Sequence, residues 1–194
     1  MFKISVLLLL LIPIIGSFLI YFFRRNINQR EGMSLLTAVS LFFVVINLFS
    51  NEKINREVID FFTFFPGVSL SFFYDHLSII FAFVASFLWI ITTLYSIGYM
   101  RGAKEQNQTR FFICFAIAIS STMGVAFSAN LFTLYIFYEL LSISTYALVG
   151  HHQGEEARVG ARKYLIFLFG GSIGLALPAM ILIYQISGTL DFSY

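Results

Sequence analysis

The chain has 194 residues, of which 59% are hydrophobic and 11% charged, and its net charge is +2. Soluble domains carry about 25% charged residues, so this composition, with a mean hydropathy of +0.86, indicates a membrane protein. The small net charge and the lack of a long basic run argue against a nucleic-acid partner. Cys114 is the only cysteine, which excludes an intrachain disulfide and a Cys/His zinc motif.

Six apolar segments are each close to the length that crosses the hydrocarbon core of a bilayer. Backbone groups in lipid must be paired within the segment, so the expected fold is an all-α polytopic membrane protein. The expected spans are Ile4–Phe23, Met33–Phe49, Leu77–Met100, Phe111–Ser128, Ala129–Gly150 and Tyr164–Ile186. The first span follows a lysine, as a signal peptide does, but it lacks a small-residue cleavage site, so we expect a retained helix.

Basic residues are concentrated on one side of the predicted bundle. The connections after the first, third and fifth spans carry nine of the twelve lysines and arginines, namely Arg24, Arg25, Arg30, Arg101, Lys104, Arg110, Arg158, Arg162 and Lys163. Basic loops tend to stay on the cytoplasmic side. The asymmetry therefore predicts that both termini lie outside, in agreement with an even number of spans.

The connection between the second and third spans, Asn51–Tyr74, is the only long loop predicted on the outer side. It begins charged and continues aromatic, and Pro66–Gly67 is a turn signal, so we expect a short extended or interfacial segment. Asp75 follows at the outer mouth of the third span. Its simplest role is to cap that helix at its N-terminus, and proton handling is the alternative.

Glu139 is the most informative residue of the chain because it lies in the middle of an apolar span. A carboxyl at this depth is costly and indicates a functional site, unless it is simply protonated and hydrogen-bonded to a neighbouring helix. Tyr135, Ser142 and Tyr146 lie at helical spacing on the same face. Hydroxyls around an acid suit a proton relay, although small polar groups also line helix–helix seams.

Three further ionisable residues follow on the basic side. His151 and His152 titrate near neutral pH and could deliver protons toward Glu139, or they could be plain loop residues. Lys163 is expected at the start of the sixth span, where snorkelling lysines are common. A buried lysine at that position could instead exchange protons with a relay.

The sixth span carries signals of helix packing and of a helix break. Gly170 and Gly174 form a small-xxx-small pair suited to close helix packing. Pro178 should kink the helix or free a backbone carbonyl. The sequence contains no nucleotide, haem, zinc or nucleophile motif, so we expect this chain to bind no cofactor and no metal.

Several short segments, taken in order, resemble a known family. They are FYDHLS at Phe73–Ser78, YSIGYMR at Tyr95–Arg101, RFF at Arg110–Phe112, SANL at Ser128–Leu131, FYELL at Phe137–Leu141 and STYALVG at Ser144–Gly150. The ordered set is similar to the antiporter-like, ion-translocating subunits shared by respiratory complex I, membrane-bound hydrogenases and Mrp-type sodium/proton antiporters. The resemblance covers residues 70–192, and the first 65 residues fit only as two generic spans.

The resemblance implies roles for three residues. In the family, the acid of the FYELL-like segment is an essential intramembrane glutamate, which corresponds to Glu139. A lysine near the start of the following helix is implicated in proton transfer and corresponds to Lys163. Asp75 corresponds to a recurrent acid of the YDHLS-like segment.

The resemblance also implies how the chain is organised. Family members have roughly fourteen helices built on two inverted five-helix repeats, so these residues correspond to an N-terminal part. We expect residues 1–70 to form two helices and an external loop, and residues 71–194 to begin the proton-translocating domain. The broken helix whose lysine pairs with the glutamate, and the second repeat, would lie in a longer gene product or in another chain.

These features predict a proton-translocating membrane subunit, without redox chemistry of its own, of a complex I-like NADH–quinone oxidoreductase or a multisubunit Na+/H+ antiporter. The expected partners are the other membrane subunits of that assembly, the lipid bilayer of a bacterial plasma membrane, and H+ with or without Na+. One alternative is a structural or assembly subunit without an ion pathway of its own. Another is an independent small transporter that oligomerises.

Overall fold

The structure is a computed structural model that describes residues 2–50, 58–73, 75–152 and 154–192. In these residues, six helical runs are long and apolar enough to cross a membrane. Five are single helices: α1 (Phe2–Phe22), α2 (Ile27–Ser50), α3 (His76–Gly102), α4 (Gln108–Ala126) and α5 (Leu131–Val149). The sixth run joins α6 (Glu155–Gly171), the π-helical turn η1 (Ser172–Ala176) and α7 (Leu177–Ser187). The predicted all-α polytopic fold with six spans is confirmed.

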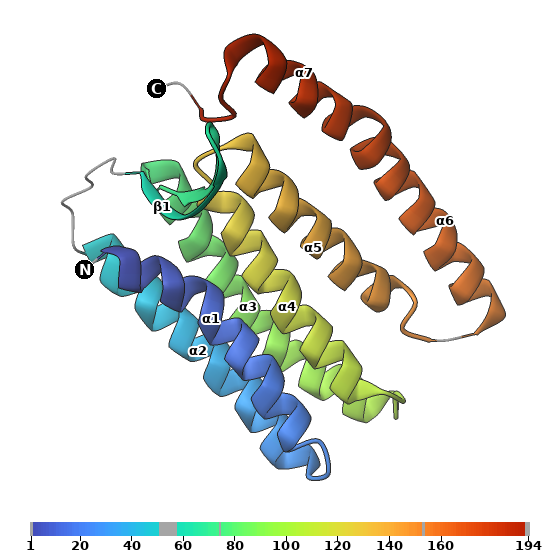
Figure 1. The fold of residues 1–194 in the computed structure, drawn as a ribbon. Coiled ribbons are helices and arrows are strands. Elements are labelled where there is room, and N and C mark those ends of the chain that lie inside the picture. The colour runs from blue at the N-terminus through green and yellow to red at the C-terminus, as the bar shows by residue number, and fades with distance from the viewer. Residues whose placement is uncertain (1, 51–57, 74, 153, 193–194) are drawn as a thin grey trace.

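The helices lie side by side as an up-and-down array (Figure 1). Helices α1 to α4 form a bundle whose core includes Leu9, Leu41, Trp89 and Met123. Helix α5 packs against α4, and the α6–α7 run lies beyond α5 at the margin of the array (Figure 1). The last run is therefore covered on one side only by residues of this chain.

The array has two ends that differ in chemistry. We call the end with the α1–α2, α3–α4 and α5–α6 connections the basic end, because most of the lysines and arginines lie there. We call the opposite end, where α1 begins and α7 ends, the hairpin end (Figure 1). Six spans place both ends of the chain at the hairpin end, and its outward orientation stays a prediction from charge.

A β-hairpin covers the hairpin end, where the sequence predicts a short extended segment. Strands β1 (Ile59–Phe65) and β2 (Val68–Phe72) are antiparallel and are joined by the expected Pro66–Gly67 turn. Gly67 adopts a φ of 78°, a left-handed conformation that glycine tolerates without strain. The charged beginning of this loop, residues 51–57, lies outside the described residues.

Hydrogen bonds tie the hairpin to the start of α5. Asn130 donates through Nδ2 to the Ser69 carbonyl at 2.7 Å, and its Oδ1 accepts from the Thr133 amide at 2.7 Å, which caps α5. The Thr133 hydroxyl oxygen accepts from the Ser71 amide at 2.9 Å. Because Asn130 caps the helix, α5 begins at Leu131 and not at Ala129 as expected.

Two helices begin earlier than their apolar runs indicate. Helix α2 begins at Ile27, where the Asn26 side chain accepts from the Asn28 amide at 3.1 Å. Helix α6 begins at Glu155 with two acidic residues in its first turn, a favourable place for negative charge at a helix N-terminus. Polar first turns extend both helices beyond the apolar segments, so Arg30 and Lys163 lie inside helices and not at their edges.

Candidate functional site

Glu139 lies one residue from the midpoint of α5, as expected for an acid near the bilayer centre. Both of its carboxylate oxygens are buried, and neither has a hydrogen-bond partner among the described residues. An unpaired carboxylate costs several kcal/mol when it is removed from water. Among the described residues, Glu139 therefore lacks the partner that would offset this cost.

Tyr135 lies next to Glu139, one helical turn toward the hairpin end. Its hydroxyl lies near the Glu139 carboxyl and near Ser172 of the π-helical turn, without forming a hydrogen bond to Glu139. Ser142, by contrast, donates its hydroxyl to the Tyr138 carbonyl at 3.0 Å, within its own helix. Of the expected file of hydroxyls, the structure therefore brings Tyr135 to the acid and holds Ser142 on the backbone.

A hydrogen bond between α5 and α6 shows the register of these two helices, that is, which residues lie at the same height along the helix axes. The Tyr164 hydroxyl donates to the Thr145 hydroxyl at 3.0 Å. Because the helices are antiparallel, this register places Gly170 at the level of Glu139 and Lys163 at the level of Tyr146. Lys163 is exposed and lies roughly 10 Å from Glu139 along the helix axis, so the two are not neighbours.

The glycines of the sixth span face open space among the described residues. A Cβ added at Gly170 or Gly174 would meet no atom within 4 Å. Pro178 is the second residue of α7, which begins directly after η1. A proline ring clashes with the carbonyl four residues earlier, and a π-helical turn relieves that clash. Close packing through the two glycines stays a prediction.

His151 lies buried at the basic end, just after α5. Neither ring nitrogen has a hydrogen-bond partner among the described residues, and the ring meets Phe111 at 5.6 Å between centroids. Burial lowers the pKa of His151, nearby Arg110 and His152 lower it further, and Glu105 opposes them. The lowered pKa favours the neutral form of the His151 ring.

A cavity lies close to His151, at the end of α5. Arg110 donates through Nη2 to the carbonyl of His151 at 2.9 Å and to that of Gly150 at 3.1 Å, which ties α4 to the end of α5. A cavity of about 400 Å³ begins there and is lined by Arg110, Tyr146, Ala147, Gly150, Arg158 and Ala161. Tyr146, the residue of the α5 face nearest the basic end, therefore borders this cavity.

The remaining expected site residues lie apart from Glu139. His152 is exposed, and its Nδ1 lies 3.6 Å from Glu105 Oε2. Asp75 is the N-cap of α3 and accepts from the amide and the hydroxyl of Ser78, each at 2.7 Å. The structure therefore gives Asp75 a helix-capping position at the hairpin end.

Sequence reasoning missed a buried ionic cluster at the basic end. Arg101 forms an ion pair with Glu31, which also lies 3.4 Å from Arg30 Nη2. Arg30 donates to the Gln108 side chain at 2.6 Å and to the Thr109 hydroxyl at 3.3 Å. We call these five residues the arginine–glutamate cluster. The sequence signal for this cluster is the pair Arg30–Glu31 directly before an apolar run. The sequence alone places this pair in a charged loop.

Two family models match the chain. The model described as the N-terminus of chain 5 of NADH-ubiquinone oxidoreductase (complex I) matches residues 66–112. The model described as the transmembrane region of NADH:quinone oxidoreductase/Mrp antiporter matches residues 128–194, which include α5 with Glu139. Together the two matches span more than half of the chain.

Curated relatives are subunits of bacterial antiporters. The Na(+)/H(+) antiporter subunit A1 of Staphylococcus haemolyticus is 31% identical over 87% of this chain and 21% of its own length. The corresponding subunit of Staphylococcus aureus is 28% identical over 90% of this chain and 23% of its own length. The chain thus spans between a fifth and a quarter of the relatives that it matches.

A solved structure shares the fold. A chain of the membrane-bound sulfane sulfur reductase, an archaeal respiratory membrane complex, superposes with a TM-score of 0.79 at 19% identity. The match covers 96% of this chain and 38% of that chain.

With its six apolar helices and staphylococcal relatives, this is a multi-pass protein of the bacterial plasma membrane. The chain belongs to the family of antiporter-like membrane subunits that NADH:quinone oxidoreductase and Mrp antiporters share.

Proposed function

We propose that this chain contributes a proton relay to an ion-translocating membrane assembly, with Glu139 as the group that takes up and releases the proton. The observation that carries the proposal is the buried Glu139 carboxyl, whose two oxygens have no partner among the described residues. An intramembrane acid without a structural hydrogen bond has no packing role to explain it. The names of the staphylococcal relatives point to Na+/H+ exchange as the reaction of the whole assembly.

The relay would run along α5 from the basic end. A proton reaches the cavity beside Tyr146, and the buried His151, whose lowered pKa favours the neutral ring, directly follows the lining residue Gly150 in the chain. Water is required between Tyr146 and Glu139, because Ser142 is hydrogen-bonded to its own helix. Tyr135 then stands on the far side of the acid, beside Ser172.

Lys163 has a supporting place in this proposal. It lies on α6 at the level of Tyr146 and is exposed. Its positive charge would raise the free energy of a second cation close to it. The other membrane subunits of the assembly would supply the group that alternately attracts and releases the proton on Glu139.

The test is Glu139→Gln in the complete assembly, measured as sodium-dependent proton movement in inverted membrane vesicles. Gln keeps the size of the side chain and removes the titrating group, so we expect transport to fall to the vesicle background. Glu156→Gln, the same change at an exposed position of α6, is the matched control and should leave transport intact. Assembly is checked by the amount of subunit that co-purifies.

The same variant distinguishes a proton relay from the main alternative, a structural or assembly subunit. In a structural or assembly subunit, Glu139→Gln would lower the yield of the complex or its unfolding temperature without changing transport per assembled complex. Unchanged transport per complex would remove Glu139 from the mechanism. Replacing Na+ with NADH as the driving substrate distinguishes an antiporter from a redox-driven pump.

A further inference from the structure

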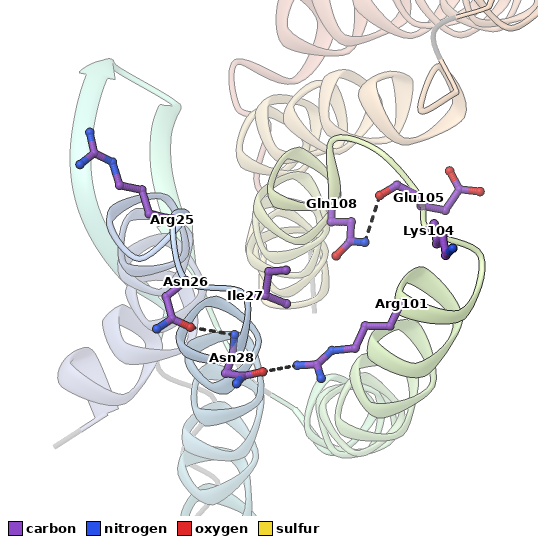
Figure 2. A pocket seen from close by; sticks show the side chains of 8 residues that line it. All are labelled: Arg25, Asn26, Ile27, Asn28, Arg101, Lys104, Glu105 and Gln108. Atoms are coloured by element: carbon purple, nitrogen blue, oxygen red, sulfur yellow. Dashed lines mark hydrogen bonds between the residues drawn. The ribbon is translucent and has the colours of Figure 1, made fainter.

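A cavity of about 640 Å³ opens at the basic end, apart from Glu139. It lies between the α1–α2 turn and the α3–α4 turn, as Figure 2 shows. The residues that line it are mostly polar or charged, namely Arg25, Asn26, Ile27, Asn28, Arg101, Lys104, Glu105 and Gln108. Three cations and one acid give the lining a net positive charge, and Glu105 also lies 3.6 Å from His152.

Arg101 is the best-positioned cation of this cavity. Its Nε and Nη2 are held by the buried Glu31, and Nη2 also donates to the Asn28 side chain at 2.6 Å (Figure 2). Within the part of the chain that the structure describes, Nη1 makes no hydrogen bond, and the side chain is half-exposed. The arginine–glutamate cluster thus fixes one guanidinium with a donor still free, which reduces the entropy lost when an anion binds.

Lys104 and the start of α2 add positive potential. The Lys104 ammonium has no hydrogen bond or ion pair among the described residues, whereas Arg25 extends away from the other side chains in Figure 2. Helix α2 is 24 residues long and begins at this cavity, so its dipole is positive there. The ligand favoured by this site is a compact anion that accepts hydrogen bonds from arginine, such as a phosphate group.

Next to the cavity, helices α2 and α3 each carry a glycine. The Asn28–Arg101 bond and the 5.8 Å contact between the Phe42 and Phe87 rings set the antiparallel register of α2 and α3. By this register Gly32 and Gly98 lie at one level, directly next to the cavity. A Cβ at either glycine would meet no atom within 4 Å.

The next turn of the same two helices is apolar and accessible. Leu36 and Leu94 lie at one level by the same register and are 56% and 54% exposed. The polar cavity is thus followed, along α2 and α3, by exposed apolar side chains. Free phosphate would use only the first part, whereas a phospholipid would use both.

We propose that this cavity binds the phosphate of an anionic phospholipid, with an acyl chain along the exposed apolar surface of α2 and α3 beside Gly32 and Gly98. Arg101 donates to the phosphate through Nη1, and Lys104 contributes charge. The net positive lining favours a headgroup without a cationic moiety over a zwitterionic one. Anionic lipid is enriched in the leaflet that faces the basic ends of membrane proteins.

The test measures lipid binding to the intact protein, purified with its accompanying subunits, by native mass spectrometry. The probes are phosphatidylglycerol, phosphatidylethanolamine with the same acyl chains, and inorganic phosphate. We expect phosphatidylglycerol to bind in preference to phosphatidylethanolamine. Lys104→Gln should weaken phosphatidylglycerol binding about fivefold, because one basic residue near an anionic headgroup is lost. Lys104→Arg should retain binding.

Two further variants decide between a lipid and free phosphate. Gly98→Leu places a bulky side chain on this surface next to the cavity and should weaken phosphatidylglycerol binding while leaving any phosphate binding unchanged. Arg162→Gln, the same loss of charge on exposed α6, is the control and should have no effect. Equal binding of the two lipids, an unaffected Lys104→Gln variant, or complete displacement by inorganic phosphate would each overturn the proposal. The unfolding temperature of each variant shows that the protein is folded.

Discussion

At the residue scale, the chain buries two ionisable groups whose side-chain atoms lack partners among the described residues. Glu139 lies at mid-membrane on α5, and His151 lies where α5 ends at the basic end. Among the described residues, no side-chain hydrogen bond would be broken by a change in the charge of either group.

The lowered pKa of His151 predicts how stability depends on pH. Between its lowered pKa and 6.5, the unfolded chain binds more protons than the folded chain. The contribution of His151 to stability is thus complete above 6.5 and is lost as the pH falls through this window. We expect the unfolding temperature in detergent to fall with acidification in the wild type and to fall less in His151→Phe, which keeps a ring beside Phe111.

The matched control for this pH profile is His152→Gln, because His152 is exposed. It should reproduce the acid sensitivity of the wild type. A His151→Phe variant with the same slope as the wild type between pH 5.5 and 7, a range set by the ordinary pKa of about 6.5, would show that other groups cause the acid sensitivity.

At the element scale, the arginine–glutamate cluster joins α2, α3 and α4 at the basic end. Glu31→Gln would leave Arg30 buried without its counter-charge. Removing one member of a buried ion pair costs about 3 kcal/mol, so we expect a clear drop in unfolding temperature. Glu105→Gln, at the same end but paired with an exposed histidine, should cost less than about 1 kcal/mol. Equal effects of the two changes would mean that the cluster does not stabilise the bundle.

The contact between α4 and α5 depends on a glycine. A Cβ at Gly124 would lie 2.1 Å from the Phe137 ring, which lies two residues before Glu139. Gly124→Ala should therefore push α5 outward and destabilise the protein by about 1–3 kcal/mol, the usual cost of overpacking. Thermal unfolding measures this cost, and Gly160→Ala on the open face of α6 is the control, which should be neutral or stabilising. A stable Gly124→Ala variant would contradict this close contact.

Several elements were predictable from sequence, and others were not. The six spans follow from hydropathy, and the Pro66–Gly67 turn follows from its residue types. The polar first turns of α2 and α6 were missed, because hydropathy detects the apolar part of a helix and not its capped ends. Glu139 was found because an acid stands out in an apolar run, whereas Arg30 and Glu31 stood next to loop charges, which hid their burial.

At the scale of the whole molecule, the α6–α7 run is the surface where further helices are expected. Phe167 on this run is 81% exposed, and α5 is its main neighbour among the described residues. Since Glu139 has no hydrogen-bond partner among these residues, we expect additional protein near this side of the array. A photo-crosslinking residue in place of Phe167 should capture a membrane-subunit segment, identified by mass spectrometry. The same probe at Phe18 on α1, which is 69% exposed, should capture lipid.

The crosslinking result has a clear contrary outcome. If both positions capture only lipid in the assembled complex, the α6–α7 run is a lipid-facing margin. The partner of Glu139 would then have to approach from another side of α5.

The central claim is that Glu139 changes its protonation state during transport, and infrared difference spectroscopy of the complete assembly tests it most directly. The spectrum is recorded while an imposed sodium gradient drives transport, and the carboxyl C=O band of the wild type is compared with that of Glu139→Gln. We predict a protonated-carboxyl band that appears and disappears with the gradient in the wild type and is missing in the variant. An identical band in both proteins would show that another carboxyl carries the proton.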